Sequence, residues 1–153
     1  RRRHEASLPL FRETATQHLG NLGEAFAYQG LGETALAQGG DAALAARHLH
    51  HALALFRDLG YQSGQAWCLA GLAGAAELDE DPERAARLWG AAEVQRQAIG
   101  CRPAPAARAT RERLTTAASE QLGEEAFDAA WAEGQAMTME QAIELALQAQ
   151  VDA

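Results

Sequence analysis

The chain has 153 residues, a length that fits one domain with a sizeable core. Apolar residues make up 48% and charged residues 22%, which excludes an intrinsically disordered chain. The net charge of -8 argues against sequence-independent binding to nucleic acid, because such binding requires a basic surface that neutralises phosphates. Alanine dominates the apolar content and β-branched residues are scarce, so an all-α fold is predicted.

Neither a membrane span nor a secretion signal is predicted. The uncharged run from Gln62 to Ala76 is too short and too rich in glycine to cross a bilayer, and no charged-then-apolar leader precedes it. We therefore expect a cytoplasmic protein. The three arginines that open the chain are more consistent with a segment of a longer protein than with a nucleic-acid-binding arm.

Helix-start and helix-stop signals divide the chain into eight predicted helices. Pro9 suits the first turn of the first helix, which the segment GNLG, residues 20 to 23, is expected to end. Asp41 and Asp81 stand at N-cap positions, and the second is followed by Pro82 at the first helical position. The predicted helices cover about residues 9–19, 22–38, 41–58, 63–78, 82–100, 106–122, 124–133 and 139–150.

These helices repeat. A shift of 40 positions places Asp41 on Asp81 and Gly60 on Gly100, where each glycine is expected to end a helix. Because the connecting loops are short, consecutive helices must pack antiparallel. Small residues then let the two backbones of a hairpin approach, and a large residue fills the gap to the next hairpin.

This pattern resembles the tetratricopeptide repeat, although the period is longer than the roughly 34 residues usual for that family. The residues that follow the pattern are Leu31, Gly32, Ala45, Leu49 and Ala52 in the first copy, and Leu72, Ala73, Ala85, Trp89 and Ala92 in the second. The resemblance implies antiparallel hairpins stacked as a short right-handed solenoid, with Trp89 between hairpins.

The C-terminal part carries a second resemblance. The segment LGEEAFDAAWAEGQAMTMEQAIELAL, residues 122–147, places Phe127 and Trp131 on one helical face, ends that helix at Gly134, and opens the next with a capping box of Thr138 and Gln141. Together with the repeats, it is similar to the end of the helical-repeat region of large bacterial signal-transduction ATPases, including those with a LuxR-type DNA-binding domain. The resemblance implies that the two aromatic residues plug the open end of the solenoid and that the Thr138-capped helix folds over them.

We therefore predict a single helical-repeat domain over residues 1–153. Residues 1–20 would be the remnant of a preceding repeat, residues 22–60 and 62–100 two repeats, and residues 105–153 the capping helices.

Repeat proteins commonly bind partners on the concave surface that the first helix of each hairpin lines. The alignment places five residues there: Phe26, Gln29, Glu33, Trp67 and Glu77. Phe26 and Trp67 could equally belong to the core. The acidic residues of this set favour a basic or amphipathic peptide as partner, because opposite charges attract.

The resemblance thus implies a protein-binding or ligand-binding sensor or scaffold segment of a multidomain bacterial transcriptional regulator. Its partner would be a peptide segment, a neighbouring domain of the parent regulator, or a small-molecule effector, without direct binding to nucleic acid or membrane. The alternative is a free-standing homo-oligomerising repeat adaptor that forms a homodimer through its N-terminal face.

Neither catalysis nor a cofactor is predicted. The chain has no lysine and no phosphate-binding loop, and Ser7, Ser63 and Ser119 lack the strand-to-helix elbow of a hydrolase nucleophile. His48 and His51 share a helical face, but a zinc site requires three or four ligands, so no metal is expected.

The two cysteines suggest no disulfide framework. Cys68 lies in an apolar helical run and is predicted to be buried and inert. Cys101 lies in a predicted loop, where its thiol can reach solvent, and neither cysteine has the spacing of a metal or redox motif.

Overall fold

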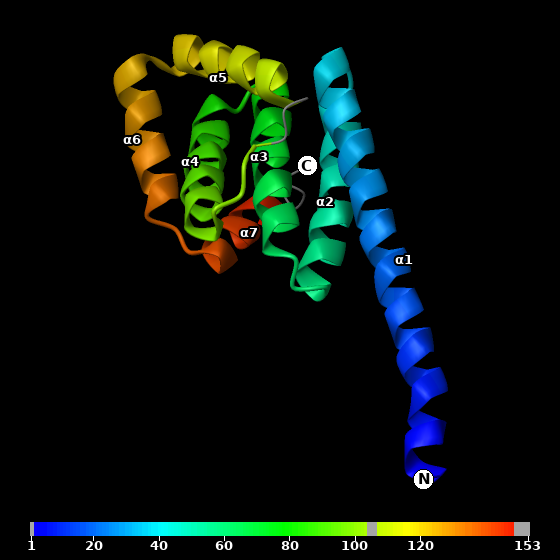
Figure 1. The fold of residues 1–153 in the computed structure, drawn as a ribbon. Helices are drawn as coiled ribbons and strands as arrows, with labels where there is room; N and C mark the ends of the chain where they lie inside the picture. The colour runs from blue at the N-terminus through cyan, green and yellow to red at the C-terminus, as the bar shows by residue number, and fades with distance from the viewer. Residues whose placement is uncertain (1, 104–106, 149–153) are drawn as a thin grey trace.

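The computed structural model describes residues 2–103 and 107–148, with side chains described from Arg12 onward. All regular structure in these ranges is helical, so the all-α class is confirmed (Figure 1). The predicted helix start at Ala106 and the predicted helix end at Gln150 lie outside the described residues. The helices are α1 (Arg2–Gln38), α2 (Ala42–Asp58), α3 (Gln62–Leu78), α4 (Pro82–Ile99), α5 (Arg108–Leu122), α6 (Glu124–Gln135) and α7 (Met139–Gln148).

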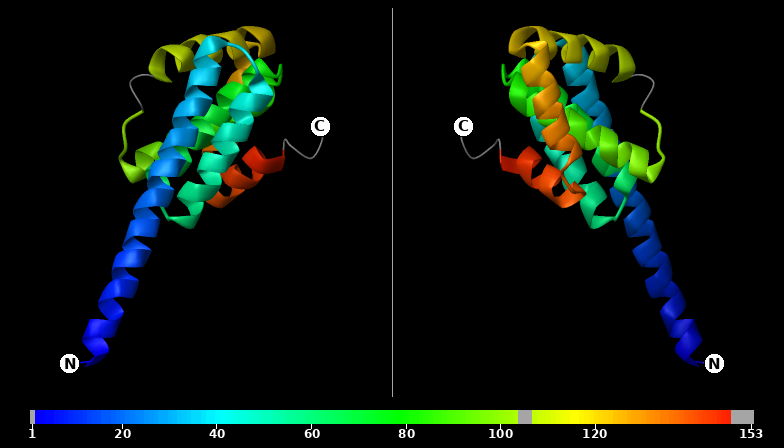
Figure 2. Two further views of the ribbon diagram at one scale, coloured as in Figure 1. Left: turned by 90° about the vertical axis from the view of Figure 1, so that its right-hand side faces the viewer. Right: turned by 90° about the vertical axis from the view of Figure 1, so that its left-hand side faces the viewer.

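The first helix differs from the prediction. The chain is helical from Arg2 through Pro9 and through the segment GNLG, so the two helices predicted before residue 38 are one. Gly20 and Gly23 have no positive φ, and a glycine in a helix costs only about 1 kcal/mol relative to alanine, which a long helix can absorb. The N-terminal part of α1 projects beyond the other helices (Figures 1 and 2), and residues 12–20 are exposed.

The hairpin stack is confirmed, because α1 packs on α2, α2 on α3, and α3 on α4. Leu49 of α2 is fully buried between two glycines. A Cβ on Gly32 of α1 or on Gly71 of α3 would come within 2.8 Å of the Leu49 side chain. One large residue thus fills the space between its own hairpin and the next. Trp89, its counterpart in the repeat, is only 2% exposed.

The predicted helix ends are confirmed at four positions. The Asp41 carboxylate accepts a hydrogen bond from the backbone N–H of Leu44 at 3.1 Å, and Asp81 makes the equivalent bond at the start of α4. Gly60 and Gly100 have φ values of 69° and 80°, a left-handed conformation that favours glycine and ends a helix.

Helix α6 covers the outer side of α4 (Figure 1). The expectation that Gly134 ends this helix is wrong, because α6 continues to Gln135. The glycine has another role: a Cβ there would lie 1.9 Å from the carbonyl oxygen of Arg87. A Cβ added to Gly90 of α4 would lie 2.2 Å from the carbonyl oxygen of Trp131. Two glycines therefore let the backbones of α4 and α6 touch.

Helix α7 opens with the predicted capping box. The Thr138 N–H donates to Gln141 Oε1 at 3.0 Å, and the Gln141 N–H donates to Thr138 Oγ1 at 3.2 Å. The expectation that α7 folds over Phe127 and Trp131 is wrong. The helix packs on α3 and α4, on the opposite side of the hairpins from the loop that follows α4 (Figure 2).

Polar contacts hold α7 in this position. His50 of α2 shares a 2.9 Å hydrogen bond with the carbonyl oxygen of Ala146, and the Arg84 guanidinium of α4 donates to the carbonyl oxygens of Leu145 and Ala146. The side chain of Ile143, in α7 itself, is buried. The last helix therefore closes the face formed by α2, α3 and α4.

Candidate functional site: a tryptophan-lined cavity

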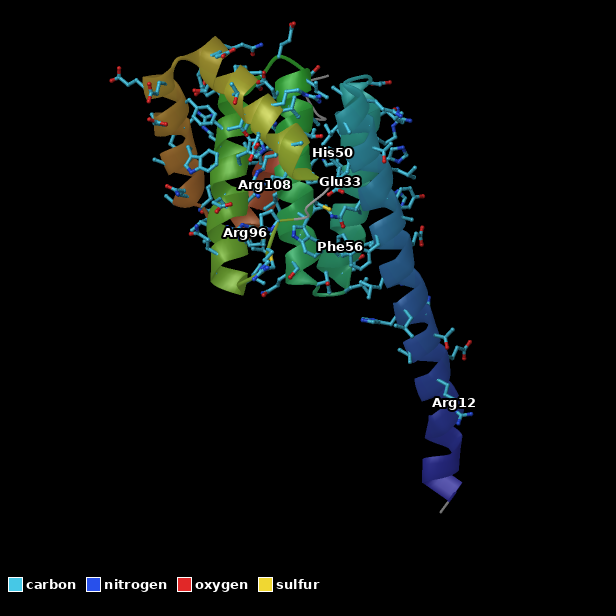
Figure 3. All side chains as sticks on the ribbon, turned by 45° about the horizontal axis from the view of Figure 1, so that its top comes forward. Arg12, Glu33, His50, Phe56, Arg96 and Arg108 are labelled. Carbon is cyan, nitrogen blue, oxygen red and sulfur yellow. The ribbon has the colours of Figure 1, made fainter. Side chains whose placement is uncertain are left out.

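A cavity of about 330 Å³ lies among α1, α3, α4 and α5, next to the loop that follows α4. Its walls come from α1, α3 and α5, the first helix of each hairpin, and from α4, with one residue of α6. Figure 3 labels Glu33, Arg96 and Arg108, which reach the cavity from three of these helices. A volume near 300 Å³ is at the lower end of the range for small-molecule sites, which are mostly apolar with a few polar groups.

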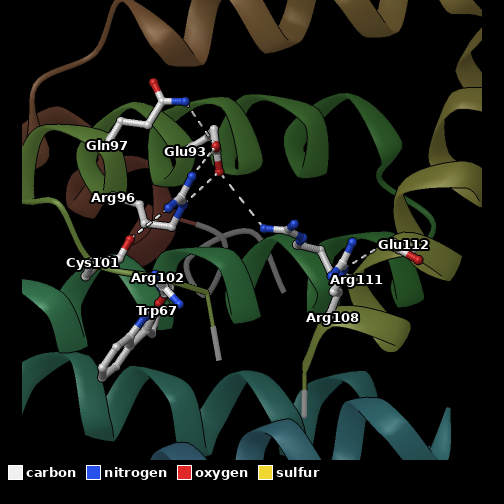
Figure 4. Close-up of polar contacts among 9 residues, drawn as sticks. All are labelled: Trp67, Glu93, Arg96, Gln97, Cys101, Arg102, Arg108, Arg111 and Glu112. Carbon is white, nitrogen blue, oxygen red and sulfur yellow. Dashed lines mark hydrogen bonds and ion pairs between the residues drawn. The ribbon is translucent and has the colours of Figure 1, made fainter. Parts of the chain in front are cut away.

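All three tryptophans of the chain line this one cavity. Trp67 comes from α3, and its indole N–H donates to the carbonyl oxygen of Arg102 at 3.1 Å, which ties the loop after α4 to the cavity rim (Figure 4). Trp89 comes from α4 and is buried, whereas Trp131 of α6 is half-buried. Leu36 and Leu114 complete the apolar wall, and both side chains lie against Gly74.

An aromatic cluster adjoins the Trp67 end of the cavity. The ring of Phe26 packs edge-on against Phe56 at a centroid distance of 5.2 Å and against Tyr61 at 5.7 Å. Its distance to Trp67 is 6.5 Å. Phe56 is fully buried, but Phe26 remains 41% exposed. Phe26 and Trp67 therefore lie together on the inner face, partly in the core and partly accessible.

The centre of the polar wall is an ion-paired network on α4. Arg96 donates to both carboxylate oxygens of Glu93, at 2.6 and 3.1 Å, and to the carbonyl oxygen of Cys101 at 2.8 Å (Figure 4). The hydrogen bond from Arg96 lowers the pKa of Glu93, and the same bond raises the pKa of Arg96. Both groups are therefore charged and satisfy each other, so this pair adds no net charge to the cavity.

Two further arginines at the start of α5 are less engaged. Arg111 lies 4.0 Å from Glu93 and is 36% exposed at its side chain, while Arg108 contacts Glu112 at 3.2 Å in an exposed pair. Both residues line the cavity. Exposed ion pairs contribute little free energy, about 0–1 kcal/mol, so these guanidinium groups can exchange partners.

Glu33 is the remaining acidic group of the lining. It accepts a hydrogen bond from the Gln29 amide at 3.2 Å. Burial raises the pKa of Glu33, and the hydrogen bond from Gln29 only partly opposes that rise. Gln29 is itself buried, and its Oε1 has no hydrogen-bond partner among the described residues.

The structure brings together four of the five residues predicted to face the groove. Phe26 contacts Trp67, Gln29 bonds to Glu33, and both Glu33 and Trp67 line the cavity. Glu77 is not among the lining residues. It is buried near the end of α3, and that burial raises its pKa.

The charge of the lining also differs from the acidic groove that the sequence suggested. Three arginines and two glutamates line the cavity. Sequence reasoning placed neither Arg108 nor Arg111 here, although one signal was available: no acidic residue occupies the first turn of α5, where arginines stand instead. Because positive charge is unfavourable at a helix N-terminus, arginines in a first turn can indicate a binding role.

The other side chains that could carry chemistry take part in packing or hydrogen bonding within the fold. Tyr28 stacks on His51 at 4.0 Å, and His50 shares a hydrogen bond with the carbonyl oxygen of Ala146 in α7. Within residues 12–103 and 107–148, no three His, Cys, Asp or Glu side chains gather as metal ligands would. Cys68 is fully buried, as predicted, and burial raises the pKa of its thiol; Cys101 is half-buried.

No family model, no characterised protein and no solved structure matches the chain. The fold and the cavity define a stack of antiparallel helical hairpins with a space of about 330 Å³ between the first helices of the hairpins and α4. None of the described helices combines the length and the apolar character that a bilayer-spanning segment requires.

Proposed function

We propose that this chain is a ligand-binding sensor segment of a multidomain bacterial transcriptional regulator, without catalysis of its own. The observation that carries the proposal is the cavity, because the first helices of all three hairpins converge on it and all three tryptophans line it. In a core that serves packing alone, these rings would interdigitate with their neighbours and leave no cavity of about 330 Å³.

The arrangement also suits a sensor mechanically. A ligand between α1, α3 and α5 would contact the two repeats and the capping helices at once. A ligand that binds one packing arrangement of the helices more tightly than another shifts the protein toward the first arrangement. Such a shift would carry a signal along the solenoid. The regulator context comes from the resemblance of residues 122–147 and the repeats to signal-transduction ATPases.

The test is a thermal-shift screen of small molecules against the protein and two variants. Ala70→Leu adds three carbon atoms to the cavity wall, and Ala43→Leu adds the same atoms at an exposed position of α2. A compound that binds in the cavity should raise the melting temperature of the parent and of Ala43→Leu but not of Ala70→Leu. Equal shifts in all three proteins would place binding elsewhere and contradict the proposal.

The alternative is a homo-oligomerising adaptor. Three large apolar side chains of α1 are exposed and favour it, because they could pack against a second copy: Leu19 at 68%, Leu31 at 51% and Phe26 at 41%. Light scattering over a range of protein concentrations separates the two functions, since only the adaptor requires a stable dimer.

A further inference from the structure

The polar groups of the cavity indicate the chemistry of its ligand, an inference that depends on the proposed binding function. The chain as a whole carries a net charge of -8. The lining reverses that balance, because Arg96, Arg108 and Arg111 outnumber Glu33 and Glu93. A locally positive cavity in an acidic protein attracts anions and repels cations.

The charges do not cancel evenly within the cavity. Arg96 and Glu93 neutralise each other through two hydrogen bonds. Among the described lining residues, Glu33 is the only other acidic group, and burial raises its pKa. Arg111 and Arg108 have weaker ion pairs: Arg111 lies 4.0 Å from Glu93, and Arg108 pairs with the exposed Glu112, which does not line the cavity. They make the first turn of α5 the positive part of the lining.

The start of α5 strengthens this positive end. Among the described residues, no side chain caps the first N–H groups of α5. Ala107, Arg108, Thr110 and Arg111 all line the cavity. Helix N–H groups and the positive end of the helix dipole favour an anion. Two arginines in this turn are unfavourable by themselves, and an anion between them would relieve their repulsion.

Much of the remaining lining is apolar and aromatic. The rings of Trp67, Trp89 and Trp131 and the side chains of Leu36 and Leu114 supply it. Flat aromatic groups bind well between such rings, since each buried ring contributes a large contact area. The volume of about 330 Å³ fits a small molecule of up to three rings rather than a peptide helix.

We propose that the cavity binds a small amphipathic anion: an aromatic body against the tryptophans, and one carboxylate or similar anionic group held by Arg111, Arg108 and the N-terminus of α5. This ligand differs from the basic peptide that the sequence suggested. The difference arises because Glu77 is not among the lining residues and α5 contributes arginines to the lining.

Two matched probes test the anionic group. 8-Anilinonaphthalene-1-sulfonate carries an aromatic body and one sulfonate, and N-phenyl-1-naphthylamine is the same body without the sulfonate. The first should bind the intact chain with one site and at least about tenfold more tightly than the second, as expected for a charge-assisted hydrogen bond. Binding is measured by dye fluorescence and by energy transfer from the tryptophans.

Two matched variants test the arginine. Arg111→Gln should weaken sulfonate binding about tenfold and leave binding of the uncharged probe unchanged. Arg113→Gln removes the same charge from an exposed position of α5 that does not line the cavity. This variant should bind both probes as tightly as the parent does. Far-ultraviolet circular dichroism melts confirm that both variants are folded, because the sulfonate dye also binds partly unfolded chains.

Competition then tests the sign of the charge. The carboxylate 1-naphthaleneacetate should displace the sulfonate dye, and the cation 1-naphthylmethylamine should not. Equal binding of the charged and uncharged probes, an equal effect of the two arginine variants, or better displacement by the cation would each overturn the anionic ligand while leaving a binding cavity. Failure of every probe to bind the folded parent would instead contradict the proposed binding function.

Discussion

Gly134 of α6 lies directly against the carbonyl oxygen of Arg87 in α4, so closely that a methyl group on this glycine would come within 1.9 Å of that oxygen. Gly90 makes the reciprocal contact with the carbonyl oxygen of Trp131. Both obstructing atoms belong to backbone, which cannot rotate away as a flexible side chain can. The end of the solenoid therefore depends on two glycines that let one helix lie on another.

Replacing Gly134 with alanine should consequently destabilise the protein. The added methyl group forces α6 away from α4, a kind of overpacking that costs about 1–3 kcal/mol or more. Gly23→Ala is the matched control, because this glycine is helical in α1 and a methyl group added to it would have no neighbour within 4 Å. There, alanine should raise the free energy of unfolding by about 0.5–1 kcal/mol, and urea denaturation measures both. An increase in both variants would show that α4 and α6 do not touch.

These glycines show what the sequence could and could not predict. The periodic pattern placed Gly60 and Gly100 correctly, because each follows a helix of ordinary length and has a positive φ. Gly134 looked similar locally, yet it is a packing residue inside a helix. The distinction depends on which backbone lies beside the glycine, and only the tertiary structure supplies that neighbour.

The candidate site was predictable to a similar extent. The repeat register placed Phe26 and Trp67, 41 residues apart, at equivalent positions of consecutive hairpins. Their rings lie 6.5 Å apart in the structure, because equivalent positions of stacked hairpins face the same side. The arginines of α5 were not placed there, because α5 lies outside the two repeats and its orientation is not given by their register. Glu77 was misplaced on the groove, since the last turn of α3 lies beyond the cavity lining.

Trp89 provides a test of the stacking itself. The residue is 2% exposed and lines the cavity, so its replacement with alanine should lower the free energy of unfolding by about 3–5 kcal/mol, the usual loss for a buried large aromatic residue. Trp131→Ala is the comparison, because Trp131 lines the same cavity but is half-buried, and it should cost less. A loss below about 1 kcal/mol for Trp89→Ala in denaturant melts would contradict its position between hairpins.

Glu77 should give the protein a measurable dependence of stability on pH. Its side chain is buried, its Oε2 has no hydrogen-bond partner among the described residues, and burial raises its pKa above the ordinary 4.5. The folded protein therefore binds this proton more tightly than the unfolded chain does. It follows that the free energy of unfolding rises as the pH falls through the raised pKa, and the gain is complete below 4.5.

Glu77→Gln isolates this contribution, because the amide has nearly the same shape and carries no charge at any pH. The variant should be more stable than the parent at about pH 7, where the parent holds a desolvated carboxylate. Its advantage should shrink as the pH falls toward 4.5, because Glu77 in the parent then takes up its proton. Urea denaturation at several pH values measures the difference, with Glu120→Gln at an exposed position of α5 as the control. An advantage that stays constant or grows with falling pH would mean that Glu77 is solvated in the folded protein.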